Sequence, residues 1–291
     1  MAAVVPMVVA LAGCANEEPG APASAATRAS SATGTATSIL NAGVTAQIGA
    51  PDAAMKFLFD PLYDNHFGSL EQLDAALIER IVAGEAPYDN VTAVFVSHAH
   101  GDHFSARHIT RMLAAQPELQ LVAPAQAVEQ MRAVEEWNPT FATRIRAISL
   151  DNGAQAESFE IGAAKVEAFR SPHSGWPDRH ADIHNITFRV SAASGAQMAH
   201  RVMHLGDADP GTEYYEPHAE FLSSARSGLA IVPFWFFSED DAEGLVDTTL
   251  NAEGAVGMHV PAQEPASLKD SGWDYFTEEG QVVPIAEVSE Q

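Results

Sequence analysis

The stretch His98-Ala99-His100-Gly101-Asp102-His103 places three imidazoles and one carboxylate within six residues. It follows Ala93-Val94-Phe95-Val96, an apolar run that is typical of a buried strand. Imidazole suits zinc, iron, copper and nickel, and a carboxylate adds harder oxygen character. A lone histidine is usually a surface or core residue, but this clustering at the end of a strand predicts a metal site at the edge of a sheet.

The pattern His-x-His-x-Asp-His after a strand resembles the signature of the metallo-β-lactamase superfamily. That family has further ligands at later positions, and each has a candidate in this chain. The candidates are His173 in Ser-Pro-His, Asp207 in His-Leu-Gly-Asp, and His259 in Met-His-Val. Asp60, which follows Phe57-Leu58-Phe59, matches an aspartate that the family often carries upstream. The resemblance covers roughly 39–261, with these positions in the family's order.

The resemblance implies an α/β fold, a four-layer αββα sandwich with two sheets inside and helices outside. It also implies two divalent metal ions, for which zinc is the first expectation and manganese or iron the alternatives. The implied ligands of the first ion are His98, His100 and His173. The implied ligands of the second ion are Asp102, His103 and His259. Asp207 would bridge the two ions, because each of its oxygens can face one cation.

Two cations with a water between them lower the pKa of that water toward neutrality, so the resemblance implies a metal-bridging hydroxide as the nucleophile. Asp102 carries the further hypothesis of a catalytic role, in which it orients the hydroxide or shuttles a proton. Metal-bound histidine usually donates its other N–H to a carboxylate or carbonyl. We therefore expect Asp60 to support a ligand histidine, and the alternative is a turn cap before Pro61.

The other histidines have weaker contexts. His184 is a candidate either for the third ligand position or for a contact with substrate. We prefer His173 as the ligand, because Ser-Pro-His after a strand matches the family better. His204 is expected to face strand packing, and His108 to be solvated or to support a ligand. No sequence context favours a role for the remaining histidines, which are His66, His180, His200 and His218.

Several elements follow from the hydrophobic pattern. Residues 69–83 read as a helix, with Ser69 and Gln72 as a capping box. Residues 229–237 read as an apolar strand that includes Phe234-Trp235-Phe236-Phe237. Alternation along that strand would bury two of these four aromatic residues. Core packing is the favoured interpretation of them, and a hydrophobic wall for an acyl or aromatic substrate is the alternative.

The composition excludes one class of partner. The chain has 291 residues, of which 46% are hydrophobic, so a substantial core can form. Its formal net charge of -24 repels polyanions, and no basic footprint for a nucleic-acid polymer is present. A small phosphodiester stays open as a substrate, because two metal ions reverse the local field.

The N-terminus resembles a bacterial lipoprotein signal. Residues 1–13 end in Leu-Ala-Gly before Cys14, which would carry lipid, and the apolar run is too short to span a bilayer. The first basic residue is Arg28, whereas signal peptides begin with a basic region, so an incidental cysteine is the alternative. Residues 14–38 read as a flexible tether and 39–291 as the hydrolase domain. We therefore expect a periplasmic protein of the bacterial cell envelope, anchored to a membrane by lipid.

The sequence thus predicts a dinuclear metal-dependent hydrolase that acts on an ester, lactone, amide or small phosphodiester bond of a small-molecule or lipid-like substrate. A dedicated β-lactamase is disfavoured, because by the resemblance such enzymes usually lack a bridging aspartate and several use a cysteine ligand. Two alternatives stay open, an iron-dependent redox enzyme on the same scaffold and a non-catalytic binding lipoprotein.

Overall fold

A computed structural model describes Met1, Ala2 and residues 34–289 of the chain. The chain divides into two units, Met1–Ser31 and Ala32–Gln291, and the second holds every described helix and strand. The predicted signal peptide, Cys14 and most of the predicted tether lie outside the described residues. Within the described part, no helix is both long and apolar enough to cross a membrane.

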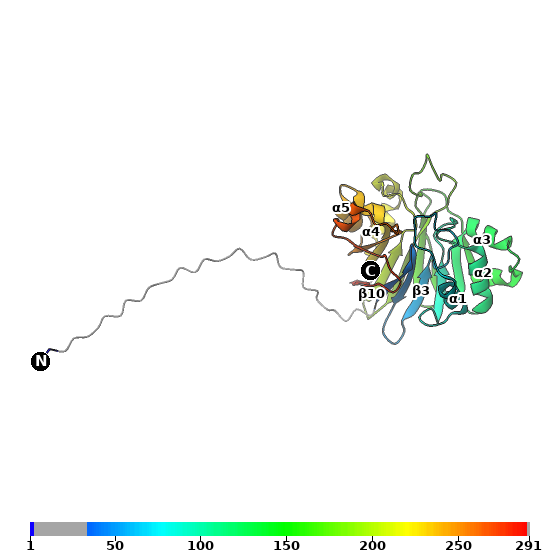
Figure 1. The fold of residues 1–291 in the computed structure, drawn as a ribbon, viewed down its shortest axis with the longest axis horizontal. Coiled ribbons are helices and arrows are strands. Elements are labelled where there is room, and N and C mark those ends of the chain that lie inside the picture. Colours follow the sequence, from blue (N-terminus) through cyan, green and yellow to red (C-terminus); the bar gives the residue numbers. More distant parts are fainter. Residues whose placement is uncertain (3–33, 290–291) are drawn as a thin grey trace. The chain divides into compact units, whose positions relative to one another are not determined.

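Two mixed sheets form the middle of the second unit (Figure 1). The strands of the first sheet, in spatial order, are β14 (Val282–Pro284), β1 (Thr35–Leu40), β2 (Gly43–Ile48), β3 (Met55–Phe59), β4 (Val91–Phe95), β5 (Gln120–Pro124) and β6 (Ile145–Ile148). The strands from β14 to β3 pair antiparallel, and those from β3 to β6 pair parallel.

The second sheet combines an antiparallel half, β7 to β10, with a parallel half, β10 to β13. A further strand, β15 (Glu287–Ser289), pairs antiparallel with the beginning of β10. The main path, in spatial order, is β13 (Asp274–Tyr275), β12 (Ala255–Met258), β11 (Leu229–Pro233), β10 (Met198–His204), β9 (Ile186–Ala193), β8 (Ala164–Arg170) and β7 (Glu157–Ile161).

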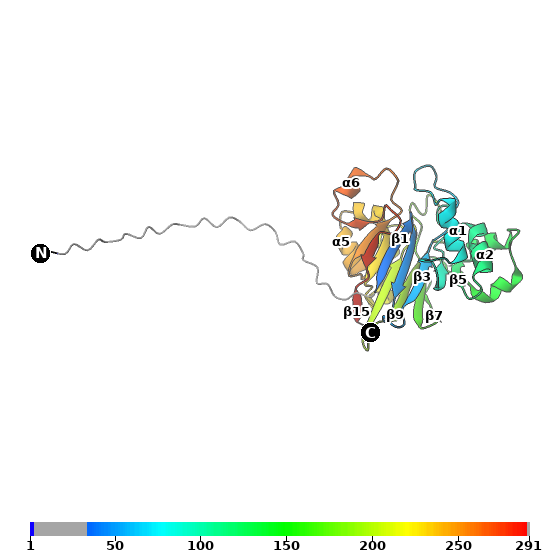
Figure 2. The ribbon, with the colours of Figure 1, turned by 60° about the horizontal axis from the view of Figure 1, so that its bottom comes forward.

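Helices cover the outer faces of both sheets (Figure 2). The first sheet packs against α1 (Ala75–Ala83), α2 (Ala106–Ala115) and α3 (Ala125–Arg132), and the second against α4 (Ala219–Ser223), η5 (Leu245–Thr249) and α6 (Ala266–Lys269). The short α5 (Ala242–Gly244) leads directly into η5. The core between the sheets includes Phe57, Phe95 and Phe188, all without solvent exposure. The four-layer αββα sandwich is therefore confirmed.

The expected capping box of the first helix is wrong. Helix α1 begins only at Ala75, because the Asp74 side chain accepts a hydrogen bond from the Leu77 backbone nitrogen at 2.7 Å. Ser69 instead lies in the preceding loop, where its carbonyl oxygen accepts from the Ala262 backbone nitrogen.

The expected boundary between tether and domain also differs from the structure. Strand β1 begins at Thr35, so residues 35–38 belong to the fold and not to the tether. They pair with β2 on one side and with β14 on the other, and the small Ala36 and Ser38 are buried. A stretch of Ala, Ser and Thr resembles a linker, but small side chains also fit a strand in a crowded sandwich.

The predicted strand over 229–237 ends early. Strand β11 stops at Pro233, and Phe234–Ser238 form the single-turn helix η4. The buried aromatic residues are the consecutive Phe236 and Phe237, whereas Phe234 and Trp235 are half-buried. The residues after 262, whose hydrophobic pattern predicts no element, supply α6 and β13 to β15.

Candidate metal centre

The predicted ligands come from loops that meet at one end of the two sheets. His98 to His103 follow β4, and in the second sheet His173 follows β8, Asp207 follows β10 and His259 follows β12. Strands β8, β10 and β12 run in the same direction, so their carboxyl ends lie at the same edge. An isolated bridge between His173 and Ala208 holds two of these loops together.

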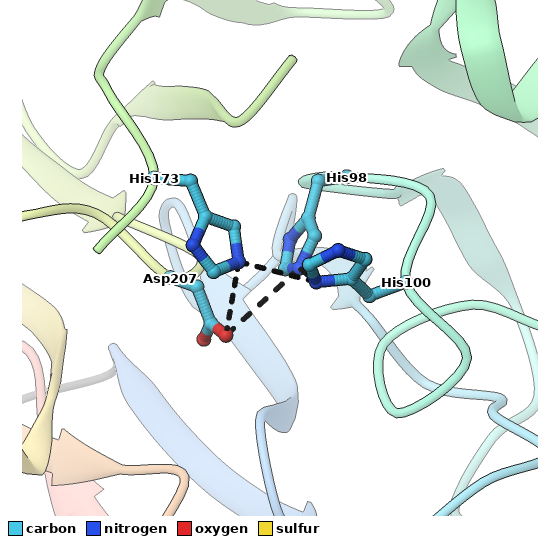
Figure 3. A group of neighbouring side chains, drawn as sticks. All are labelled: His98, His100, His173 and Asp207. Atoms are coloured by element: carbon cyan, nitrogen blue, oxygen red, sulfur yellow. Dashed lines mark hydrogen bonds and ion pairs between the residues drawn. The ribbon is translucent and has the colours of Figure 1, made fainter. Parts of the chain in front are cut away.

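The first ligand group consists of His98, His100, His173 and Asp207 (Figure 3). The Nδ1 atom of His100 lies 3.1 Å from Nε2 of His98 and 3.1 Å from Nε2 of His173. The Oδ2 atom of Asp207 lies 3.5 Å from Nε2 of His173 and 3.9 Å from Nε2 of His98. Three ring nitrogens and one carboxylate oxygen thus converge on one point.

The second ligand group consists of Asp102, His103, Asp207 and His259. The Nε2 atom of His259 lies 3.0 Å from Oδ2 of Asp102 and 3.5 Å from Oδ2 of Asp207. The Nε2 atom of His103 lies 3.0 Å from Oδ1 of Asp207. Asp207 therefore belongs to both groups, as the bridging assignment requires.

The backbone before Asp207 needs a glycine. Gly206 has a φ of +56°, and a Cβ atom there would collide with Oδ1 of Asn185 and with Cβ of Ser97. The same Asn185 oxygen accepts from the Asp207 backbone nitrogen at 3.0 Å, and its amide donates to the Leu205 carbonyl at 2.9 Å. Asn185 thereby fixes the turn that presents Asp207, a role that the sequence did not reveal.

Asp60 lies behind the second group. Its Oδ2 atom is 2.8 Å from Nδ1 of His103, and the Ser97 backbone nitrogen and hydroxyl donate to its two oxygens at 2.7 and 2.6 Å. With Nδ1 of His103 donating to Asp60, the lone pair on Nε2 points toward the ligand group. The structure thus gives Asp60 the contact that was expected of a supporting residue.

Burial and neighbouring charges shift the pKa values of the ligand residues in different directions. Burial, reinforced by His103, holds the pKa of His98 well below its ordinary value, and burial lowers the pKa of His173 to about 4. Burial also opposes a charge on His103, but Asp207 and Asp102 outweigh it and hold the pKa of His103 well above its ordinary value. Burial alone would raise the pKa of Asp207, yet His103 and His259 keep it well below. Neutral His98 and His173 and an ionised Asp207 are therefore in the forms that bind metals, whereas His103 would release a proton when a cation binds.

The residues present fit bound cations. Ligand nitrogens at the usual distance from one tetrahedral zinc ion lie about 3.3 Å apart, close to the spacings in the first group. In the second group, Nε2 of His103 and Oδ1 of Asp207 are buried and lie 3.0 Å from each other, with no hydrogen bond to any other described residue. Buried polar atoms are rarely left without partners, so their convergence points to a ligand that they share.

The other histidines with a predicted or possible role lie in different surroundings. His173 lies in the first ligand group and His184 in neither; the His184 backbone nitrogen donates to the Gln126 side chain. His204 is buried and stacks on Phe59, as expected, and His108 pairs with Asp64 at 3.2 Å. His180, for which no role was expected, has its ring 4.5 Å from that of His173.

Comparisons with known proteins agree with this arrangement. The model of the Beta-lactamase superfamily domain matches residues 55–268. A crystal structure described as a possible metal-dependent hydrolase from Veillonella parvula DSM 2008 is similar, with a TM-score of 0.54 and 15% identity over 87% of this chain and 99% of that one. The isothiocyanate hydrolase from Delia radicum gut bacteria has a TM-score of 0.52 and 14% identity over 88% and 99%.

No curated protein matches the sequence significantly. At identities this low the two solved structures show only a shared fold, whereas the family model matches well over half of the chain. The chain therefore belongs to the β-lactamase superfamily and has the metallo-β-lactamase fold.

Proposed function

We propose that this protein is a dinuclear metal-dependent hydrolase that acts on an ester, lactone, amide or small phosphodiester bond. The observation that carries the proposal is the position of Asp207 in both ligand groups, with Oδ2 facing the first and Oδ1 facing His103 of the second. A carboxylate shared in this way suits two neighbouring cations and has no evident use in a site for one.

His98, His100 and His173 would hold the first ion, and Asp102, His103 and His259 the second, with Asp207 between them. When bound, such ions lower the pKa of a water molecule and polarise the oxygen of the bond under attack. Zinc is our first choice because the six histidine and aspartate partners around Asp207 all offer nitrogen or oxygen donors that zinc accepts.

The chain's own residues would move the proton. Oδ2 of Asp102 is held by His259 at 3.0 Å, which leaves Oδ1 buried and without a hydrogen-bond partner among the described residues. This oxygen is therefore free to accept a proton from the attacking water and to return it to the leaving group. Asn41 steadies the loop, since its amide donates to the Asp102 carbonyl at 2.7 Å.

The test is elemental analysis of the purified protein together with hydrolysis of ester, lactone and phosphodiester reporters. We expect about two zinc ions per chain and a turnover of one reporter that a chelator abolishes and zinc restores. His100→Ala should lose metal and activity together while the protein stays folded. His108→Ala is the matched control, because its ring pairs with exposed Asp64 and not with either ligand group. A protein that takes up no metal would overturn the proposal.

A further inference from the structure

His180 lies on the first ligand group without belonging to it. Its ring centroid is 4.5 Å from that of His173 and 5.1 Å from that of His100, and the residue is exposed to solvent. Neither of its ring nitrogens makes a hydrogen bond or ion pair with another residue of 34–289. An imidazole beside two ligand residues therefore keeps its hydrogen-bonding capacity for a molecule from solution.

The segment that carries His180 is tied down at both ends. The Ser174 backbone nitrogen donates to the Asp207 carbonyl at 2.8 Å, and the Gln126 side chain donates to the Asp182 carbonyl at 2.6 Å. His180 itself has a φ of +57°, a left-handed conformation in which asparagine, aspartate and histidine are the commonest residues besides glycine. The fold thus holds this ring over His100 and His173.

Trp235 occupies the corresponding place beside the second group. Its ring centroid lies 5.4 Å from that of His259, and its indole nitrogen donates to the Ala208 carbonyl at 3.1 Å, one residue from Asp207. The side chain is half-buried, and Phe234 packs against it with ring centroids 5.5 Å apart. The hydrogen bond fixes an aromatic surface that is partly open to solvent at the edge of the site.

The charges near this edge favour a neutral molecule. Asp178 and Asp182 are exposed on the same segment as His180, with Arg179 as the one base between them. Across the whole chain acidic groups exceed basic ones, for a net charge of -24. Bound cations reverse this field only at the ligand groups themselves. Around them the field disfavours the approach of an anion and leaves uncharged substrates unaffected.

We propose that Trp235 and His180 determine the substrate class, which is a neutral ester or lactone with an apolar acyl chain. Trp235 packs against the acyl chain, and a ring nitrogen of His180 hydrogen-bonds an oxygen on the alcohol side of the bond. This inference rests on the proposed hydrolase function. It assigns separate effects to the two residues, because the contact with Trp235 depends on the length of the acyl chain and the hydrogen bond from His180 does not.

The test uses the zinc-loaded full-length protein and p-nitrophenyl esters from acetate to octanoate. We expect kcat/KM to rise by about threefold for each methylene added to the acyl chain, as long as the added methylene still packs on the Trp235 ring. In Trp235→Ala this dependence on chain length should disappear, and Trp235→Phe should keep part of it. Trp137→Ala is the matched control, a half-buried tryptophan in the other outer layer, and should keep the full dependence.

Substitutions at His180 should act differently. His180→Gly tolerates the positive φ and removes the ring, so kcat/KM should fall about tenfold for every ester while the chain-length dependence and the metal content stay unchanged. His180→Asn should restore part of the loss, because asparagine tolerates this backbone and keeps a hydrogen bond. His184→Ala, at the far end of the same segment, is the control and should match the wild type.

Binding of uncharged hydroxamic acids of the same chain lengths, measured by calorimetry, keeps the test independent of turnover. If the wild type binds zinc and hydrolyses an amide or phosphodiester reporter but no ester or lactone, this inference fails while the proposed function stands; if it takes up no metal, the proposed function itself fails. An unchanged chain-length dependence in Trp235→Ala would overturn it. Unchanged kinetics in His180→Gly, or a loss of metal in proportion to activity, would also overturn it.

Discussion

The carboxylate of Asp60 lies 2.8 Å from Nδ1 of His103, while Nε2 of the same ring lies 3.0 Å from Asp207. One imidazole is thus held between a supporting carboxylate and a ligand carboxylate. Both Asp60 and His103 are almost completely buried, so the contact is not weakened by competition from water.

Asp60→Asn should lower zinc affinity about 10- to 100-fold, because the amide no longer fixes the ring of His103 as the ionised carboxylate does. Competition with a coloured chelator would measure the change, and of two binding steps the one that fills the second ligand group should be affected. Asp64→Asn is the matched control, since Asp64 pairs with His108 at the surface. Equal affinities in the wild type and Asp60→Asn would contradict the supporting role.

Gly206→Ala should destabilise the fold by about 3 kcal/mol, because the added Cβ would collide with Asn185 and Ser97 at a backbone angle that alanine disfavours. Urea unfolding of the metal-free protein would measure this without interference from metal binding. Gly254→Ala, where a Cβ meets no atom within 4 Å, should change stability by about 0.5 kcal/mol or less. Similar values for the two variants would show that the turn before Asp207 is not tightly packed.

Glu167 and Arg189 form a buried ion pair in the second sheet. Nε of Arg189 lies 2.8 Å from Oε2 of Glu167, and the Arg189 side chain has no solvent exposure. Glu167→Gln should cost about 3 kcal/mol at pH 7, because it leaves the arginine charge buried without its partner. Glu157→Gln, at a surface pair with Arg146, should cost about 1 kcal/mol or less.

The effect of Glu167→Gln should depend on pH. Burial alone would raise the pKa of Glu167, but Arg189 outweighs it and holds the pKa below its ordinary value. A lowered pKa in the folded state adds stability above the pKa of the unfolded chain, about 4.3, and that stability is lost as the pH falls through the folded value. Urea unfolding at pH 7 and pH 3 should therefore show the difference between wild type and variant shrinking in acid. A difference that stays constant would contradict the charge contribution.

Much of the site could be predicted because its ligands lie at the ends of regular strands. His98 to His103, His173, Asp207 and His259 all follow apolar runs that the hydrophobic pattern marks, and the family's order supplies the rest. Residues that support the site through contacts distant in sequence could not be predicted in this way. Asn185 acts through a hydrogen bond to a residue 22 positions away, and nothing in its local sequence indicates that contact.

The predictions about the fold that were wrong failed for similar reasons. Small residues at 35–38 resemble a tether, and only their pairing with β14 near the C-terminus makes them a strand. The aromatic run after Pro233 continues the apolar pattern of β11, but the chain turns there into η4, which leaves Trp235 beside His259. His180 lies in an irregular segment, where no periodicity shows which way a side chain points.

The central claim is that two cations share Asp207. Diffraction data collected at the zinc absorption edge from crystals of the zinc-loaded protein would test it most directly. We predict two anomalous peaks about 3.5–4 Å apart, one among His98, His100 and His173 and the other beside His103 and His259, with one oxygen of Asp207 directed at each. A single peak in the first group at saturating zinc, with Asp207 bound on one side only, would contradict the account.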